Sequence, residues 1–204
     1  QYPGHPFSEP YIPEVNKLGF FKRHGLDTSK PLLVLLPGSR QQEIDRHWKV
    51  FLGAVNIILK KKPEVQVCVA KTSNVNIEPI PEYIRVENKL TECAILHADV
   101  ALASSGTATL KCAVHDTPVV VCYKMSGLSW VLVKRLSKVP YASMVNLIAK
   151  KRVVPEFLQS KMKTRPISEA LLKLFGQSQD KKNILFHFEE VRRSLGLPGV
   201  YKRA

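Results

Sequence analysis

The chain has 204 residues, of which 45% are hydrophobic and 24% are charged, and this composition is typical of one globular domain with a substantial core. It excludes a disordered, collagen-like or disulfide-stapled chain. The formal net charge of +14 is uneven, because residues 1–120 carry 14 Lys and Arg against 12 Asp and Glu, whereas residues 121–204 carry 17 against 5. The basic part indicates an anionic partner, such as nucleic acid, a phosphorylated ligand or lipid headgroups, or simply a cationic surface.

Strand and helix patterns alternate along most of the chain. Residues 1–30 are Pro-rich and irregular apart from one short helical pattern, and we expect them to connect this domain to another. Residues 31–160 then alternate apolar runs with amphipathic stretches, which predicts a doubly wound, Rossmann-like α/β domain with a parallel sheet. Strands are predicted at 32–36, 65–70, 84–86, 99–103 and 118–122, and helices at 41–61, at 91–97 with Thr91 as N-cap, and at 106–114.

After Tyr123 the pattern becomes helical and basic. An amphipathic helix predicted at 128–136 carries Lys134 and Arg135, and a basic step follows the apolar segment 145–149. Further helices are predicted near 156–160, 167–174 and 181–195.

The first strand-to-helix turn has the features of a phosphate-binding loop. Ligands of open parallel sheets bind beyond the carboxyl ends of the strands, where this turn is expected. Gly38 permits a tight turn, and Ser39 with Gln42 fits a capping box that would free amide donors. Arg40 can form a bidentate contact with a phosphate. A structural turn with an exposed arginine is the alternative.

A second turn follows the strand predicted at 99–103. The amides and hydroxyls of Ser105, Gly106 and Thr107 would lie at a helix N-terminus, where an anion is stabilised. Small residues at such a turn can equally serve packing, but two such turns on one sheet edge favour a common phosphate site.

Several other site classes are excluded. The chain has no G-x-G-x-x-G, P-loop, H-E-x-x-H or G-x-S-x-G pattern, and its six histidines show no ligand spacing, so we expect no metal and no cofactor. The four cysteines form no C-x-x-C pair and lie among apolar neighbours, which indicates buried thiols. The N-terminus has no signal-peptide pattern, and the first residue is not Met, so the chain is expected to begin within a longer protein.

An ordered set of short motifs covers about residues 4–160. In chain order they are Gly4-His5-Pro6, Leu36-Pro37-Gly38-Ser39-Arg40 with Glu43-Ile44, Ser105-Gly106-Thr107-Ala108-Thr109-Leu110, Pro118-Val119-Val120, Tyr123-Lys124-Met125, Lys134-Arg135-Leu136, Pro140-Tyr141-Ala142-Ser143, Asn146-Leu147-Ile148-Ala149 and Val154-Pro155-Glu156-Phe157-Leu158-Gln159. Each motif is modest, but together they resemble the C-terminal half of the lipid-A-disaccharide synthase family.

The resemblance implies an inverting, metal-independent glycosyltransferase with two Rossmann-like domains, the GT-B type. Such an enzyme transfers 2,3-diacylglucosamine from its UDP derivative to 2,3-diacylglucosamine 1-phosphate and releases UDP. The C-terminal domain would hold the donor, and the general base would come from the N-terminal half, so this chain alone is expected to be inactive.

The same resemblance assigns roles to individual residues. The two turns would cradle the diphosphate through Ser39, Arg40, Ser105, Gly106 and Thr107, with Lys111 beside them. Tyr123, Lys124, Met125, Asn146 and Glu156 would support the donor site. Two of these positions depart from the family: Lys124 replaces Arg, and Lys111 replaces a Glu that accepts hydrogen bonds from ribose, which an ammonium cannot do. Lys111 would then either reach a phosphate or impair the pocket.

The resemblance also implies partners and a location. The enzyme would act at the inner face of the bacterial inner membrane, in the cytoplasm, where basic side chains can hold it against anionic headgroups. The residues predicted to face the membrane are Lys134, Arg135, Lys150, Lys151 and Arg152. Residues 161–204 are expected to form a basic helical tail that packs on the N-terminal half or on a partner subunit, and a homodimer is possible.

Three alternatives remain open. The chain could belong to another UDP-sugar enzyme of this architecture, such as a different glycosyltransferase or a 2-epimerase. It could be a catalytically impaired relative, as Lys111 suggests. A nucleic-acid-binding module is disfavoured, because no aromatic residues alternate with the basic ones.

Overall fold

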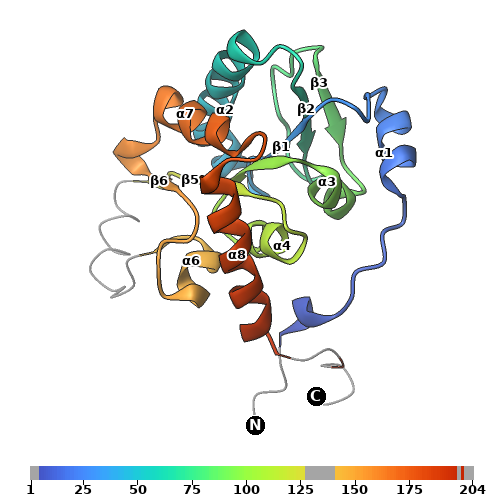
Figure 1. Ribbon diagram of the computed structural model, residues 1–204. Helices are drawn as coiled ribbons and strands as arrows, with labels where there is room; N and C mark the ends of the chain where they lie inside the picture. The colour runs from blue at the N-terminus through green and yellow to red at the C-terminus, as the bar shows by residue number, and fades with distance from the viewer. Residues whose placement is uncertain (1–4, 127–140, 197–198, 200–204) are drawn as a thin grey trace.

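The computed structural model describes residues 5–126, 141–196 and 199. Its centre is a sheet of six parallel strands in the order β3-β2-β1-β4-β5-β6 (Figure 1). The strands are β1 (Leu32–Leu36), β2 (Gln66–Ala70), β3 (Ile84–Glu87), β4 (Val100–Ser104), β5 (Val119–Tyr123) and β6 (Glu156–Leu158). The order reverses between β1 and β4, so the predicted doubly wound sheet is confirmed and its switch point lies there.

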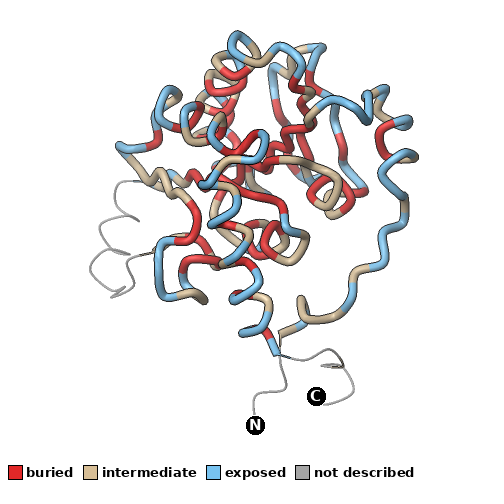
Figure 2. The backbone as a smooth tube through the Cα atoms, in the orientation of Figure 1, coloured by how far each residue is buried: buried red, intermediate tan, exposed pale blue. Residues whose placement is uncertain are grey.

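Helices cover both faces of the sheet. They are α1 (Lys17–His24), α2 (Gln41–Lys61), α3 (Thr91–His97), α4 (Thr107–Val114), α6 (Met144–Ala149), α7 (Thr164–Leu174) and α8 (Gln179–Ser194), with short 3-10 turns at Pro6–Ser8 and Gln159–Lys161. α2 packs against α7 on one face, and α4 packs against α3, α6 and α8 on the other. Every residue of β1 and β4 is buried between these layers (Figure 2).

The amphipathic pattern of α2 determines which side of the helix meets the sheet. Ile44, Trp48, Phe51, Val55 and Ile58 recur at spacings of three and four, and all five are buried. The predicted bounds of this helix are confirmed. The four cysteines are also buried and free, as predicted.

The segment 156–160 was predicted to be helical, and that prediction is wrong. It forms the edge strand β6, which pairs with β5, followed by a 3-10 turn. Pro155 disfavours helical geometry in the residue before it, and its carbonyl accepts a hydrogen bond from Val121 N, which starts the ladder. Three residues are too few to show a strand period in the sequence.

Thr91 was predicted to cap its helix, but Leu90 is the N-cap and Thr91 is the first helical residue. The reason is the side chain of the last residue of β3. The buried Glu87 accepts hydrogen bonds from the amides of Lys89 and Leu90 at 2.6 and 2.8 Å, and so satisfies this turn without a side-chain cap.

Residues 161–196 belong to the core of this domain. Residues 161–204 are predicted from the sequence to pack on an N-terminal half or a partner subunit, and within the described chain Ile167, Leu171, Ile184, Phe188 and Val191 are already buried. α7 lies on β4 and β5, and α8 lies on α4 and α6. A further contact of this tail with an N-terminal half stays a prediction.

No helix in the described part of the chain has the length and apolar character needed to cross a membrane. The helix predicted at 128–136, with Lys134 and Arg135, lies outside the described residues.

Candidate functional site

A cavity of about 390 Å³ lies at the carboxyl ends of β1, β2 and β4, at the switch point of the sheet. It brings together the two turns that the sequence analysis singled out. Its polar lining comprises Ser39, Arg40, Glu43, Lys71, Thr72, Thr91, Ser104, Ser105, Thr107 and Lys111, with Gly38 and Gly106 among the remaining lining residues. Lys71 and Thr72, directly after β2, were missed by the sequence analysis because no motif marks them.

The first turn is held by a buried carboxylate. Gly38 has φ +130°, and a side chain on it would collide with Glu43. Glu43 Oε2 accepts a hydrogen bond from Ser39 N at 3.2 Å, and its Oε1 lies 3.5 Å from Arg40 Nη1. The predicted capping box of Ser39 and Gln42 is wrong, because Arg40 occupies the N-cap position of α2 and Glu43 takes the Ser39 amide. The Arg40 side chain is 79% exposed and extends into solvent.

A fully buried histidine lies beneath this turn. His47 Nδ1 is 2.9 Å from Pro37 O, and Lys124 N lies 3.1 Å from its Nε2. Burial lowers the pKa of His47, although its two backbone hydrogen bonds and Glu43 oppose that effect. His47 therefore joins the turn after β1 to the segment after β5.

The second turn is fixed by a distant segment. Gly106, at φ +125°, is the N-cap of α4 and has no side-chain cap. Ser105 Oγ donates to Ala142 O at 2.5 Å, so its proton is used within the protein and the hydroxyl is left as an acceptor. Thr107 is exposed at the cavity wall.

Lys111 lines the cavity but has an ionic partner. Its ammonium forms an ion pair with Glu92 and lies 5.6 Å from the ring centroid of Phe7. Glu92 also accepts from His115 Nε2 at 3.0 Å. Burial alone would raise the pKa of Glu92, but the hydrogen bonds from Lys111 and His115 outweigh it and lower that pKa. The charge of Lys111 is thus matched within the chain.

Asn146 and Glu156 form one buried network. Asn146 Nδ2 donates to Val154 O and Glu156 Oε1, and its Oδ1 accepts from the amides of Val153 and Val154. Glu156 also accepts from the amides of Ala142 and Ser143 and from the Ser143 hydroxyl. Because Ala142, whose amide donates to Glu156, also accepts the hydrogen bond of Ser105, this network fixes the segment that holds the second turn.

The segment after β5 lies outside the cavity wall. Tyr123 is half-buried, and burial followed by the charge of Glu43 raises its pKa. Lys124 is exposed and Met125 is partly buried. The structure therefore places Tyr123, Lys124 and Met125 beside the site, linked to it through His47.

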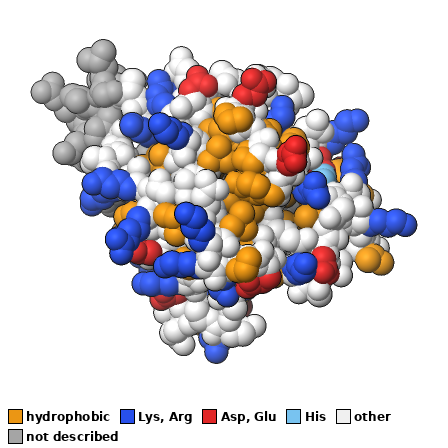
Figure 3. Space-filling model, turned by 90° about the horizontal axis from the view of Figure 1, so that it is seen from above, with side chains coloured by type: hydrophobic (Ala, Val, Ile, Leu, Met, Phe, Trp, Pro, Cys, Tyr) orange, Lys and Arg blue, Asp and Glu red, His pale blue; other side chains and the backbone are white. Residues whose placement is uncertain are grey.

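The predicted membrane-facing residues are only partly described. Lys150, Lys151 and Arg152 follow α6 and are exposed, and Lys151 pairs with Glu190 at 2.7 Å. On the face seen in Figure 3, Lys and Arg side chains surround a stripe of apolar ones and do not gather in one patch.

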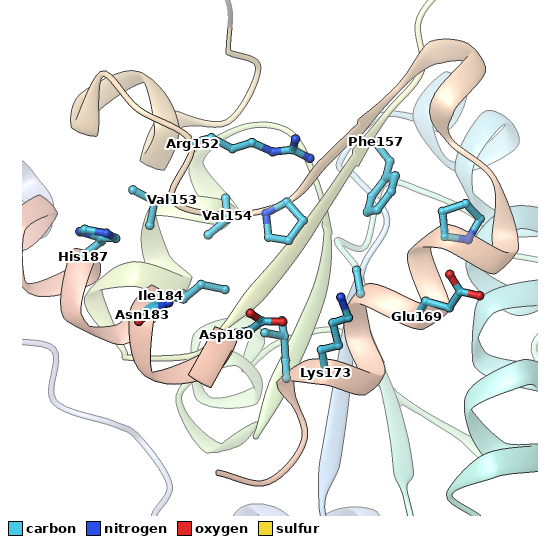
Figure 4. Close-up of a pocket in the computed structure, with 14 residues that line it drawn as sticks. Arg152, Val153, Val154, Phe157, Glu169, Lys173, Asp180, Asn183, Ile184 and His187 are labelled. Carbon is cyan, nitrogen blue, oxygen red and sulfur yellow. The ribbon is translucent and has the colours of Figure 1, made fainter. Parts of the chain in front are cut away.

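A second cavity, of about 560 Å³, lies between β6, α7 and α8 (Figure 4). It is the larger of the two, but no residue of the two strand-to-helix turns lines it, and its charged lining includes Arg152, Lys173, Glu169 and Asp180. It is also remote from the switch point, so the smaller cavity is the candidate site.

Comparisons with known proteins identify the family. The model of the lipid-A-disaccharide synthetase family matches residues 1–197. The chain belongs to this family. A lipid-A-disaccharide synthase from Solibacter usitatus is 36% identical over 207 residues, which cover 97% of this chain and 54% of that protein. The chain therefore spans about half the length of the curated relatives that it matches.

Solved structures show the same fold at low identity. The glycosyltransferase WaaG of lipopolysaccharide biosynthesis superposes with a TM-score of 0.52 at 14% identity, over 97% of this chain and 51% of that one. The structure of S. aureus MnaA with UDP superposes with a TM-score of 0.58 at 10% identity, over 94% and 47%. The chain thus has the Rossmann-like fold of one GT-B domain.

Proposed function

We propose that this chain is the donor-binding half of a glycosyltransferase of lipid A biosynthesis. It would bind UDP-2,3-diacylglucosamine for transfer to 2,3-diacylglucosamine 1-phosphate, giving lipid A disaccharide 1-phosphate and UDP. The observation that carries the proposal is the cavity at the switch point, where Arg40 of the first turn and Lys71 after β2 lie around the same space as the second turn, which opens α4 at Thr107. Membership of the lipid-A-disaccharide synthetase family supports the choice of substrate.

The chemistry of this half would be stabilisation of the leaving group. Departing UDP gains negative charge on its diphosphate, and fixed cations and amides stabilise charge that develops in a transition state. Arg40 and Lys71 supply the cations, and the N-terminus of α4 at Thr107 supplies amides. The general base for the acceptor hydroxyl would come from the N-terminal half.

Lys111 makes the ribose contact unusual. An ammonium offers no acceptor to a ribose hydroxyl, and this one is already paired with Glu92. We expect Lys111 to add to the positive potential around the diphosphate instead. If that is its role, Lys111→Gln weakens UDP binding; if the residue marks an impaired relative, UDP does not bind at all.

The wider partners follow from the same proposal. The acceptor and donor carry acyl chains, so the enzyme would lie against the anionic membrane surface, with Lys150, Lys151 and Arg152 as candidate contacts. The N-terminal half of the same enzyme would complete the active site. No nucleic acid is expected as a partner.

The direct test is a titration of the chain with UDP and, as control, ADP, followed by amide-shift NMR at low salt. Saturable, uridine-selective shifts at Arg40, Lys71 and Thr107 are expected. Arg40→Ala should lower the affinity about tenfold, a typical loss for a charge-assisted contact, whereas Arg165→Ala on α7 should not. Equal responses to both nucleotides would reduce the site to a general phosphate pocket, and no response would contradict the proposal.

The alternative is another UDP-sugar enzyme of this architecture, which the similarity to the UDP-bound S. aureus protein favours. Competition distinguishes the two. If the alternative is correct, a UDP-sugar without acyl chains should displace UDP as effectively as the acylated donor. If the lipid A proposal is correct, the acylated donor should be the better competitor.

A further inference from the structure

His47 is the one fully buried histidine among the described residues. It lies on the face of α2 that meets the sheet, between Ile44 and Phe51, with its ring parallel to that of Phe51 at an interplanar angle of 13°. Both ring nitrogens face backbone groups, and these groups belong to loops that leave two different strands. A purely apolar side chain would fill this place without joining the loops.

The two partners determine the protonation state of the ring. A carbonyl can only accept, so the nitrogen facing Pro37 O carries the proton. An amide can only donate, so the nitrogen facing Lys124 N is bare. Only the neutral Nδ1–H tautomer satisfies both contacts. A second proton would sit on Nε2 and face the Lys124 N–H directly.

The surroundings of the ring favour the neutral form. Tyr123 on β5 has its ring centroid 5.6 Å away, and the charged neighbours on α2 are Glu43 and Arg46. Burial lowers the pKa of His47 more than its hydrogen bonds and Glu43 raise it. At neutral pH the ring therefore keeps both contacts, and acid opens the one to Lys124.

We infer that His47 is a positioning residue of the donor site. It holds the turn that carries Gly38 and Arg40 at a constant distance from the segment after β5, so that Arg40 and the backbone of this turn keep their place at the cavity wall. The role of the link in binding rests on the proposed function, but the link itself does not.

Two substitutions separate the contacts. His47→Asn places an amide nitrogen near the position of Nδ1 and keeps the Pro37 contact only. His47→Gln places an amide oxygen near the position of Nε2 and keeps the acceptor for Lys124. Neither side chain titrates. His97, whose Nε2 lies 2.9 Å from Val15 O and away from the cavity, provides the matched control His97→Asn.

The experiment measures UDP affinity of the 204-residue chain and its variants between pH 5 and 8, with the ring nitrogens and the Lys124 amide followed by NMR. At pH 8 we expect His47→Asn to bind UDP about tenfold more weakly, and His47→Gln and His97→Asn to bind within about threefold of the wild type. UDP itself titrates near pH 6, so variants are compared with wild type at each pH.

The inference predicts that the Lys124 amide shift follows the His47 titration, and that acid weakens UDP binding more in wild type than in His47→Gln. It is overturned if His47→Asn binds UDP like the wild type, if both His47 variants lose binding equally, or if the ring is not the Nδ1–H tautomer. If UDP binds neither the wild type nor any variant, the proposed function is contradicted but the positioning role of His47 is not. The Lys124 amide would then still decide whether the link exists.

Discussion

The two turns that face the cavity are built in different ways. The first is held by its own helix: Glu43 and His47, four and ten residues beyond their backbone partners, fix Ser39 and Pro37. The second is held from a distance, because Ser105 donates to Ala142 O, 37 residues further along. The side chains that fix the first turn thus come mainly from its own helix, whereas the second turn, besides its local bond from Thr109 to Gly106 O, is tied to a far segment.

The largest effect should come from the network behind the second turn. Asn146→Ala leaves the buried amides of Val153 and Val154 without an acceptor, and each unpaired group costs about 1–3 kcal/mol. We expect the free energy of unfolding to fall by about 3 kcal/mol in urea denaturation. Asn183→Ala, which removes an exposed bond to Gln179, is the control and should change it by less than about 0.5 kcal/mol. Similar losses of unfolding free energy for Asn146→Ala and Asn183→Ala would show that the network behind the second turn does not stabilise the fold more than an exposed contact does.

A pair of glycine substitutions sharpens the comparison. Gly38→Ala and Gly106→Ala both force a side chain into positive φ, at about 1–3 kcal/mol each, but only the first also meets a neighbour, Glu43. We expect Gly38→Ala to lose more stability in thermal unfolding. Adding Glu43→Ala should recover part of that loss, a non-additivity expected for residues in contact. Full additivity would show that Glu43 does not constrain the turn.

The pH dependence of stability tests the local link at His47. A histidine whose folded pKa is lowered contributes stability that is fully present above its unfolded pKa of about 6.5 and is lost as the pH falls through and below that value. Wild type should therefore lose stability between pH 7 and 5 relative to His47→Gln. Glu92 has a lowered pKa and loses its stabilising effect only at more acidic pH, below about 4.3. Parallel curves for wild type and variant in this window would contradict the neutral, buried state of His47.

The smallest effect is expected outside both turns. Lys151 and Glu190 form an exposed ion pair with about half of each side chain in solvent. Exposed pairs contribute about 0–1 kcal/mol, so Lys151→Ala should barely move the urea midpoint. The same variant should lower binding to anionic vesicles if this segment faces a membrane. A vesicle affinity equal to that of the wild type would remove Lys151 from the proposed contact.

Much of the sheet was predictable because its strands are short apolar runs bounded by Pro and Gly. Five of the six strands lie within one residue of their predicted bounds. The edge strand β6 was missed because three residues cannot show a period. The packing of α7 and α8 on this sheet was not predictable, because a helical pattern indicates which face is apolar but not what covers it.

The site was predictable only where its residues lie next to strand ends. Both turns were found in that way, and the cavity contains them. Glu43, His47 and Lys71 were not found as site residues, since their roles depend on which loops fold over them. One signal was present for His47: its spacing from Ile44 and Phe51 places a polar ring on the buried face of α2. The pairing of Lys111 with Glu92 across two helices had no such signal.

The two ends of the described region are hydrogen-bonded to each other. His5 N donates to Leu195 O at 2.8 Å, and Gly199 N donates to Glu9 Oε1 at 2.8 Å, so both ends of the described region meet at one corner (Figure 1). A circular permutant that joins these ends through a short linker and opens the exposed stretch at Ser73 and Asn74 should keep all six strands in register.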